Sequence, residues 1–121
     1  MILGFKDLRV WKLGHELTLE VYKITSTFPE KEKFGIVSQL RRCSSSVPAN
    51  IVEGQSRRST KEFVQFLFQA RGSLAETQYF LILSEDLKYI SKIQNEKLQE
   101  QYEQLSRQLN ALIVTLRNKK T

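Results

Sequence analysis

The sequence has little of the residues that break helices or carry metal and redox chemistry. Its 121 residues include five Gly, two Pro, one Cys and one His. So few chain breakers, with no recurring turn dipeptides, argue against an all-β fold. A single Cys excludes an internal disulfide and a cysteine metal site, which fits a reducing compartment. A single His cannot supply the paired Glu-x-x-His motifs of a di-iron bundle.

Long apolar runs and catalytic motifs are also missing. No stretch approaches the roughly 18 apolar residues of a membrane span, and the first residues are too soon charged for a signal peptide. We therefore expect a cytoplasmic protein with no membrane partner. The sequence has no Walker loop, no G-x-G-x-x-G and no nucleophile elbow, so we expect neither an enzyme nor a cofactor or metal site. His15 is expected to be a packed or partly exposed helix residue, and Cys43 a small buried hydrophobe.

Apolar residues at steps of three and four, by contrast, recur along most of the chain. This spacing is typical of amphipathic helices. It predicts a first helix that ends at Pro29, then helices over about 36–53, 60–88 and 95–116. Short connections between such helices predict one domain over residues 1–121, an all-α, antiparallel up-down-up-down four-helix bundle.

One proline lies inside the second helix. Pro48 removes a backbone donor and crowds the preceding turn, so we expect a bend there and not a stop. We expect Ser44, Ser45 and Ser46 to hydrogen-bond the carbonyls that the proline leaves unpaired.

The helix ends carry their own signals. We expect Gly54 to end the second helix as a left-handed C-cap. Ser59, with Glu62 three residues later, is a capping-box start for the third helix. Asp7 and Asn95 are the expected caps of the first and fourth helices.

The third helix contains more apolar surface than one helix contact needs. It has two adjacent seams. The first seam consists of Phe63, Leu67, Ala70, Leu74, Thr77, Leu81 and Ser84, and the second of Phe66, Ser73, Phe80 and Leu87. The small pair Gly72 and Ser73 is expected to let a neighbouring helix come close. The first helix adds a second, half-polar stripe, and surplus stripes of this kind usually become subunit interfaces.

Positive charge is concentrated in the middle of the chain. The formal net charge is +6, and residues 41–72 hold six basic side chains against two acidic ones. The basic residues are Arg41, Arg42, Arg57, Arg58, Lys61 and Arg71, and they are the candidate nucleic-acid contacts. Antiparallel packing would put Arg57, Arg58 and Lys61 at one corner, where forked guanidinium groups suit phosphate.

The same charges have a structural reading, a solvated face with ion pairs between subunits or helices. Glu53 and Glu76 are expected to pair with arginines. No aromatic residue is interleaved with the arginines on one face, so base stacking is not expected. No segment resembles a recognition helix, so we expect backbone-led, weakly sequence-specific binding of RNA or DNA.

The stretch LRRCSSSVPANIVEGQSRRSTKEFVQFLFQARGSLAETQYFLIL, residues 40–83, resembles the signature of the 23S rRNA intervening-sequence proteins. The opening FKDLRVWKLGHEL, residues 5–17, is similar to the start of that family. The matching residues are Arg41, Arg42, Val47, Pro48, Ala49, Asn50, Ile51, Glu53, Gly54, Phe63, Phe66, Leu67, Gly72, Ser73 and Glu76. The chain departs from the pattern at Cys43 and Val52, where the family often has Ala, and both changes are small or apolar.

The resemblance implies a bacterial four-helix bundle with no agreed enzymatic activity. Related accessory variability proteins of diversity-generating retroelements form homopentameric rings, bind nucleic acid through a basic surface and contact a reverse transcriptase. Two hypotheses follow for this chain. It is either a non-catalytic, oligomeric nucleic-acid-binding bundle, pentameric as the resemblance implies, or an interaction scaffold that docks a protein such as a reverse transcriptase.

Overall fold

Four long helices account for most of residues 4–119, the part of the chain that the computed structural model describes. In order, the elements are η1 (Phe5–Asp7), α1 (Arg9–Thr25), η2 (Glu30–Glu32), α2 (Ile36–Gln55), α3 (Thr60–Asp86) and α4 (Lys92–Arg117), where η marks a short 3-10 helix. No strand occurs within residues 4–119. The all-α prediction of four helices is confirmed, although α1 ends at Thr25 and not at Pro29.

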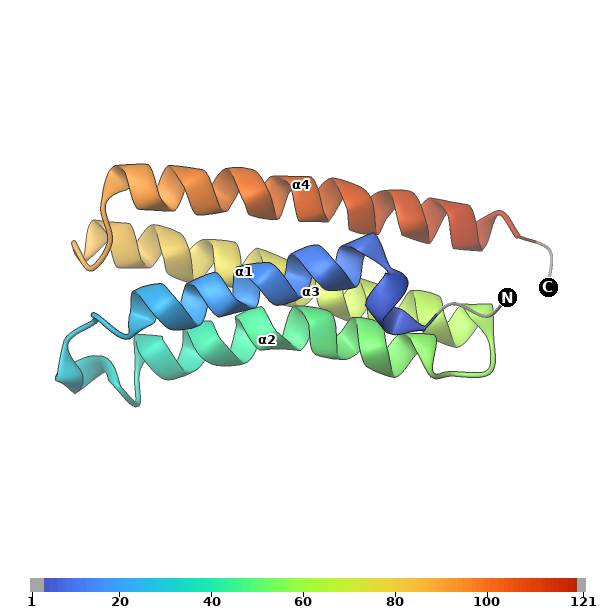
Figure 1. Cartoon of the computed structure of the whole chain (residues 1–121), viewed down its shortest axis with the longest axis horizontal. Coiled ribbons are helices and arrows are strands. Elements are labelled where there is room, and N and C mark those ends of the chain that lie inside the picture. The colour runs from blue at the N-terminus through green and yellow to red at the C-terminus, as the bar shows by residue number, and fades with distance from the viewer. Residues whose placement is uncertain (1–3, 120–121) are drawn as a thin grey trace.

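The helices lie side by side along one axis, and Figure 1 shows the chain turning back at each connection. α1 packs against α2 and α4, and α3 packs against the same two helices, most extensively against α2. α1 and α3 therefore occupy diagonally opposite corners of the bundle. Both described ends of the chain and the α2–α3 connection lie at the same end of the molecule (Figure 1).

The core follows the first predicted seam of α3. Leu67, Ala70, Leu74 and Leu81 are all buried, and Leu105 of α4 is buried with them. Each fully buried leucine contributes about 1.5–3 kcal/mol relative to an exposed one. The heptad spacing of the sequence is therefore enough to place the core.

Two helix starts differ from the prediction. Leu8, not Asp7, is the N-cap of α1, because Asp7 belongs to the preceding η1 turn. Ser91, not Asn95, begins α4 through a full capping box, in which Ser91 Oγ accepts from the Gln94 N–H at 3.0 Å and Gln94 Oε1 accepts from the Ser91 N–H at 2.8 Å. Ser59 caps α3 as predicted, accepting from the Glu62 N–H at 3.1 Å.

Gly54 does not act as a left-handed cap. α2 continues through it to Gln55, and no described glycine has a positive φ. A Cβ at this position would lie 2.6 Å from Phe66 Cβ and 3.0 Å from Phe63 Cδ1. Gly54 is therefore needed because α3 packs directly on its backbone.

The small pair in α3 behaves differently. A Cβ on Gly72 would meet nothing within 4 Å, so the expected close helix approach is wrong there. Ser73 does face a neighbour, with its Oγ 3.0 Å from Ser46 Oγ of α2.

α2 runs unbroken through Pro48, and a bend there stays a prediction. The carbonyl that the proline leaves unpaired is that of Ser44. Thr18 Oγ1 of α1 lies 3.0 Å from this carbonyl and 2.8 Å from Gly14 O, so the two carbonyls share the one hydroxyl proton.

Ser44 and Ser45 instead bond a carbonyl one turn earlier, that of Arg41, at 3.3 and 2.7 Å, and Ser46 Oγ accepts from Asn50 Nδ2 at 2.9 Å. The predicted role of the serines is therefore wrong, since a side chain from the neighbouring helix takes it.

Candidate nucleic-acid interface

Most of the net positive charge lies at the end of the bundle where the described chain starts and stops. We define the basic end as residues 4–12, 53–62 and 117–119, which meet there in Figure 1. It holds eight basic side chains and three acidic ones. The basic residues are Lys6, Arg9, Lys12, Arg57, Arg58, Lys61, Arg117 and Lys119, and the acidic ones are Asp7, Glu53 and Glu62.

The opposite end is close to neutral. Residues 20–33 and 85–100, which include the α1–α2 and α3–α4 connections, hold six basic and seven acidic side chains. The net charge of the protein is thus separated along the bundle axis and not spread evenly over it. Such a separation focuses the electrostatic potential on one end.

Three of the predicted contacts lie together at the basic end. The Arg57 guanidinium is held by Glu53, with Nη2 2.7 Å from Oε1. Its Cζ also lies 4.7 Å from the Phe66 ring centroid. Arg58 and Lys61 are exposed and form no ion pair within residues 4–119, so their charges are available to a ligand.

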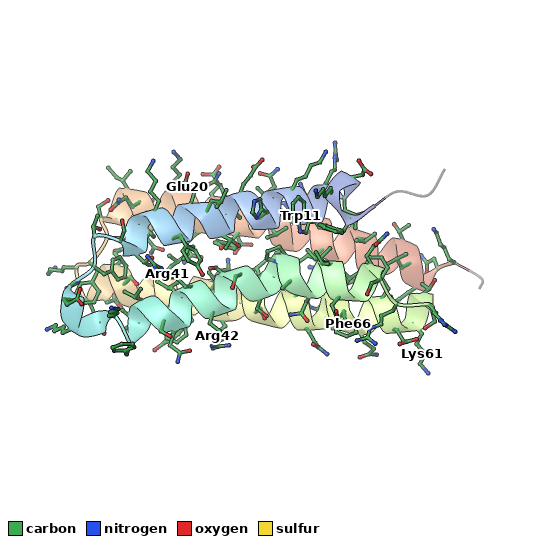
Figure 2. The ribbon with its side chains drawn as sticks, turned by 60° about the horizontal axis from the view of Figure 1, so that its bottom comes forward. Trp11, Glu20, Arg41, Arg42, Lys61 and Phe66 are labelled. Carbon is green, nitrogen blue, oxygen red and sulfur yellow. The ribbon has the colours of Figure 1, made fainter. Side chains whose placement is uncertain are left out.

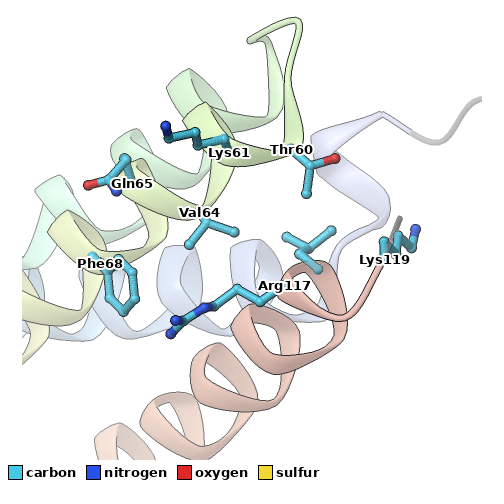
Figure 3. Close-up of a pocket in the computed structure, with 8 residues that line it drawn as sticks. Thr60, Lys61, Val64, Gln65, Phe68, Arg117 and Lys119 are labelled. Atoms are coloured by element: carbon cyan, nitrogen blue, oxygen red, sulfur yellow. The ribbon is translucent and has the colours of Figure 1, made fainter. Parts of the chain in front are cut away.

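Two further basic residues join them from α4. Arg117 and Lys119 line an open pocket of about 310 Å³ together with Lys61 of α3. Figure 3 shows Arg117 facing Val64 and Phe68 across this pocket. Sequence reasoning missed these two residues because they lie some 60 positions from Arg57 along the chain. The signal was present in the basic residues near the C-terminus, which antiparallel order brings beside the start of α3.

Arg71 lies next to this pocket on α3, three residues after Phe68, which lines it. Its Nη1 donates to Asn110 Oδ1 of α4 at 3.0 Å, and its Cζ lies 4.8 Å from the Phe68 ring centroid. Arg117 Cζ lies 6.0 Å from the same centroid. Two guanidinium groups from different helices therefore approach one phenylalanine.

Arg41 and Arg42 lie away from the basic end (Figure 2). Arg42 lies thirteen residues before Gln55, the last residue of α2, which is about 20 Å along the helix axis. Arg41 is tied to α1, with Nε 2.9 Å from Thr25 Oγ1 and Cζ 4.6 Å from the Tyr22 ring centroid. Arg42 pairs with Glu76 at 2.8 Å, so the predicted pairing of Glu53 and Glu76 with arginines is confirmed.

The expectation that no aromatic accompanies the arginines is wrong. Arg41, Arg57 and Arg71 each lie over a ring, those of Tyr22, Phe66 and Phe68. Two of these pairs could not be found from sequence spacing. Arg41 of α2 contacts Tyr22 of α1, and Arg57 of the α2–α3 connection contacts Phe66 of α3. Cation–π contacts of this kind contribute about 0.5–1 kcal/mol at exposed sites.

His15 and Cys43 have packing contacts rather than the surroundings of a catalytic or metal site. His15 is exposed and stacks on Trp11, with ring centroids 5.0 Å apart. Cys43 is fully buried, and burial raises the pKa of its thiol, which disfavours the reactive thiolate. Within residues 4–119 no group of three or more His, Cys, Asp or Glu side chains could hold a metal ion. Nor does any helix of the described chain have the length and apolar character needed to cross a membrane.

The fold and the basic end together define a four-helix bundle with one strongly cationic pole. The family model for the 23S rRNA-intervening sequence protein matches residues 6–111, and the chain belongs to this family. A crystal structure of a protein with unknown function from the S23 ribosomal protein family of Bacteroides thetaiotaomicron VPI-5482 is similar, with a TM-score of 0.77 and 26% identity. The match covers 86% of this chain and 97% of that one. No curated protein matches the chain.

Proposed function

We propose that this protein binds RNA or DNA through its basic end, as an oligomer and without catalysing a reaction. The observation that carries the proposal is the charge separation, with a surplus of five basic side chains at the basic end and a surplus of one acidic side chain at the other. A nucleic-acid backbone is the polyanion that such a pole suits best. Phosphate contacts release condensed counterions, so affinity falls steeply with salt.

Binding of this kind carries little sequence information. Phosphate contacts fix the position and orientation of the ligand, while sequence is read at base edges in the grooves. At the basic end, the basic residues without an ion pair in the described chain come from three places: Arg58 and Lys61 from the α2–α3 corner, Arg117 and Lys119 from the end of α4, and Lys6, Arg9 and Lys12 from η1 and α1. These side chains do not lie in a line on a single helix that could enter a groove of a nucleic-acid duplex. We therefore expect similar affinity for unrelated sequences of equal length and strandedness.

Exposed apolar side chains support self-association. Leu19 and Tyr22 form one patch on α1, and Tyr79 and Ile82 form another on α3, with 44–56% of each side chain exposed. Because α1 and α3 lie at diagonal corners, the two patches point to different sides of the bundle. Contact between two unlike patches is heterologous, and such contacts generate rings when the rotation closes.

A ring built this way would keep the basic ends free. Both patches lie in the part of their helix that is further from the basic end. Copies joined there would present several basic ends together, so weak phosphate contacts would add by avidity. We propose a ring, with five copies as the family resemblance implies.

Charge reversal tests the proposed binding surface. Arg58→Glu with Lys61→Glu should weaken binding of a fluorescent RNA or DNA uniformly across sequences, by about tenfold or more at low salt, because two phosphate contacts are lost. The matched control is Lys92→Glu with Lys97→Glu at the opposite end, which makes the same change in net charge. Equal loss in both variants, measured by fluorescence anisotropy, would show that only net charge matters and would contradict the proposed interface.

Light scattering coupled to size exclusion tests the oligomer. Ile82→Glu should convert the assembly to a monomer with unchanged helicity, because it puts a charge in the α3 patch. Val114→Glu is the control, since Val114 is 58% exposed on α4 outside both patches. A wild-type monomer, or an assembly unaffected by Ile82→Glu, would contradict the proposed contact.

A further inference from the structure

The pocket between the start of α3 and the end of α4 has features that phosphate binding alone does not require. Its lining is Thr60, Lys61, Val64, Gln65, Phe68, Leu116, Arg117 and Lys119. We propose that it binds one unpaired nucleotide, with the base against the apolar wall and the phosphate on the cationic rim. This inference rests on the proposed function and adds to it a preference for unpaired nucleotides.

The apolar wall suits a base. Val64 and Leu116 are buried and Phe68 is partly buried. Figure 3 shows Phe68 and Val64 next to one another along α3, with Arg117 extending toward Phe68. Unpaired bases stack on aromatic rings and on the planes of arginine side chains. Here the Phe68 ring and the Arg117 guanidinium supply both kinds of surface within one pocket, with 6.0 Å between Cζ and the ring centroid.

The rim suits a phosphate. Lys61, Arg117 and Lys119 bring three positive charges, and no acidic residue is among the lining. Three other pockets of the molecule each include a carboxylate, from Glu85, Glu20 and Asp7 respectively. A terminal phosphate carries about −1.5 to −2 charges at pH 7, more than an internal one, so it gains most from such a rim. Thr60 and Gln65 add polar groups that can bond a sugar or a base edge.

The size of the pocket limits the ligand. Its volume of about 310 Å³ is at the small end of the range of roughly 300–1,000 Å³ for ligand pockets. A pocket of this size suits a ligand of about one nucleotide. A base inside a duplex is also covered by its neighbours, so the pocket can be reached by a base at an unpaired end or bulge, or by a free nucleotide.

Anisotropy with matched probes tests the proposal on the full chain. The probes are a blunt duplex, the same duplex with one unpaired 5′-phosphorylated nucleotide, and that overhang without its phosphate. We expect the phosphorylated overhang to bind at least about fivefold more tightly than the blunt duplex, given typical stacking contributions. Phe68→Leu should remove this preference and leave blunt-duplex binding unchanged, whereas the same exchange at Phe66, outside the pocket, should keep it. Lys119→Gln should remove the part due to the phosphate.

The outcomes separate this proposal from the one before. Equal wild-type affinity for blunt and overhang probes overturns the nucleotide pocket and leaves backbone binding in place. No binding of any probe at low salt overturns the proposed function, and titration with adenosine monophosphate then tests the pocket alone. Loss of the overhang preference at micromolar adenosine monophosphate assigns the pocket to free nucleotides, and persistence of the preference at millimolar concentration assigns it to strand ends. Both of these results support the pocket.

Discussion

At the scale of single residues, two glycines show how differently the same residue type is used. A Cβ on Gly54 would lie 2.6 Å from Phe66 Cβ, an atom close to the α3 backbone that cannot turn aside. A Cβ on Gly72 would meet nothing within 4 Å. Close contact explains the first glycine, and nothing in the structure explains the second.

Alanine at these two positions should therefore change stability in opposite directions. Gly54→Ala should lower the free energy of unfolding by about 1–3 kcal/mol, because α2 and α3 must move apart. Gly72→Ala should raise it by up to about 1 kcal/mol, because alanine has the higher helix propensity. Urea unfolding followed by circular dichroism measures both. A Gly54→Ala protein as stable as the wild type would contradict the described α2–α3 contact.

Tyr102 is a second residue whose effect on stability can be measured, because its hydroxyl is buried. It is fully buried and has no hydrogen-bond partner within the described residues. Tyr102→Phe removes this unpaired group, so we expect unfolding to cost about 1 kcal/mol more. Destabilisation of similar size, in the same urea experiment, would mean that the hydroxyl has a partner in solution.

The same tyrosine predicts how stability depends on pH. Burial, with a smaller contribution from Cys43, raises the pKa of Tyr102 well above its usual range. Above a pH of about 10 the tyrosine of the unfolded chain loses its proton while the folded one keeps it. The unfolded state then binds fewer protons, so stability falls as pH rises. Tyr102→Phe should flatten this fall between pH 9 and 11 without abolishing it, because the hydrogen bond to Glu32 also raises the pKa of Tyr89. An unchanged slope would contradict the burial of the phenol.

At the scale of elements, α2 remains helical through Pro48 because another helix replaces the lost donor. Thr18 Oγ1 donates to the buried Ser44 carbonyl, so α1 and α2 are joined at the position of the proline. Thr18→Val should destabilise the protein by about 1–2 kcal/mol, since that carbonyl is left unpaired. In a Pro48→Ala background residue 48 regains its N–H, so the same change should cost less. Additive effects in this double-mutant cycle would show that the two groups are not coupled.

The sequence predicted the helices better than their ends. Helix existence depends on many apolar residues at regular spacing, as in α3, so single exceptions matter little. A cap depends on one local geometry, and other polar residues compete for it. Asn95 and Ser91 are both polar candidates for the start of α4, although only Ser91, with Gln94, has the capping-box spacing. Gly54 fits a C-cap pattern as well as it fits a close contact. Only the packing of α3 on α2 distinguishes the two roles of Gly54.

At the scale of the whole molecule, the site was predicted in part. Arg57, Arg58 and Lys61 are neighbours in sequence, so a single turn was enough to group them. Arg117, Lys119 and the ring of Phe68 belong to the same region only because α4 returns beside the start of α3. Arg41 and Arg42 are close in sequence to the others but pack against Tyr22 and Glu76. Composition and spacing do not predict which distant segments of the chain pack together, so they could not place these residues.

The central claim is that the basic end binds a nucleic-acid backbone, and the salt dependence of affinity tests it most directly. Anisotropy with one duplex between 50 and 300 mM salt gives the slope of log K against log salt concentration. Phosphate contacts by four of the unpaired cations, Arg58, Lys61, Arg117 and Lys119, predict a slope of about −3.6 for each copy in contact, reduced in magnitude by about 2 in the Arg58→Glu, Lys61→Glu variant. Absence of binding at low salt, or a slope near zero, would contradict the claim and favour docking of a protein partner instead.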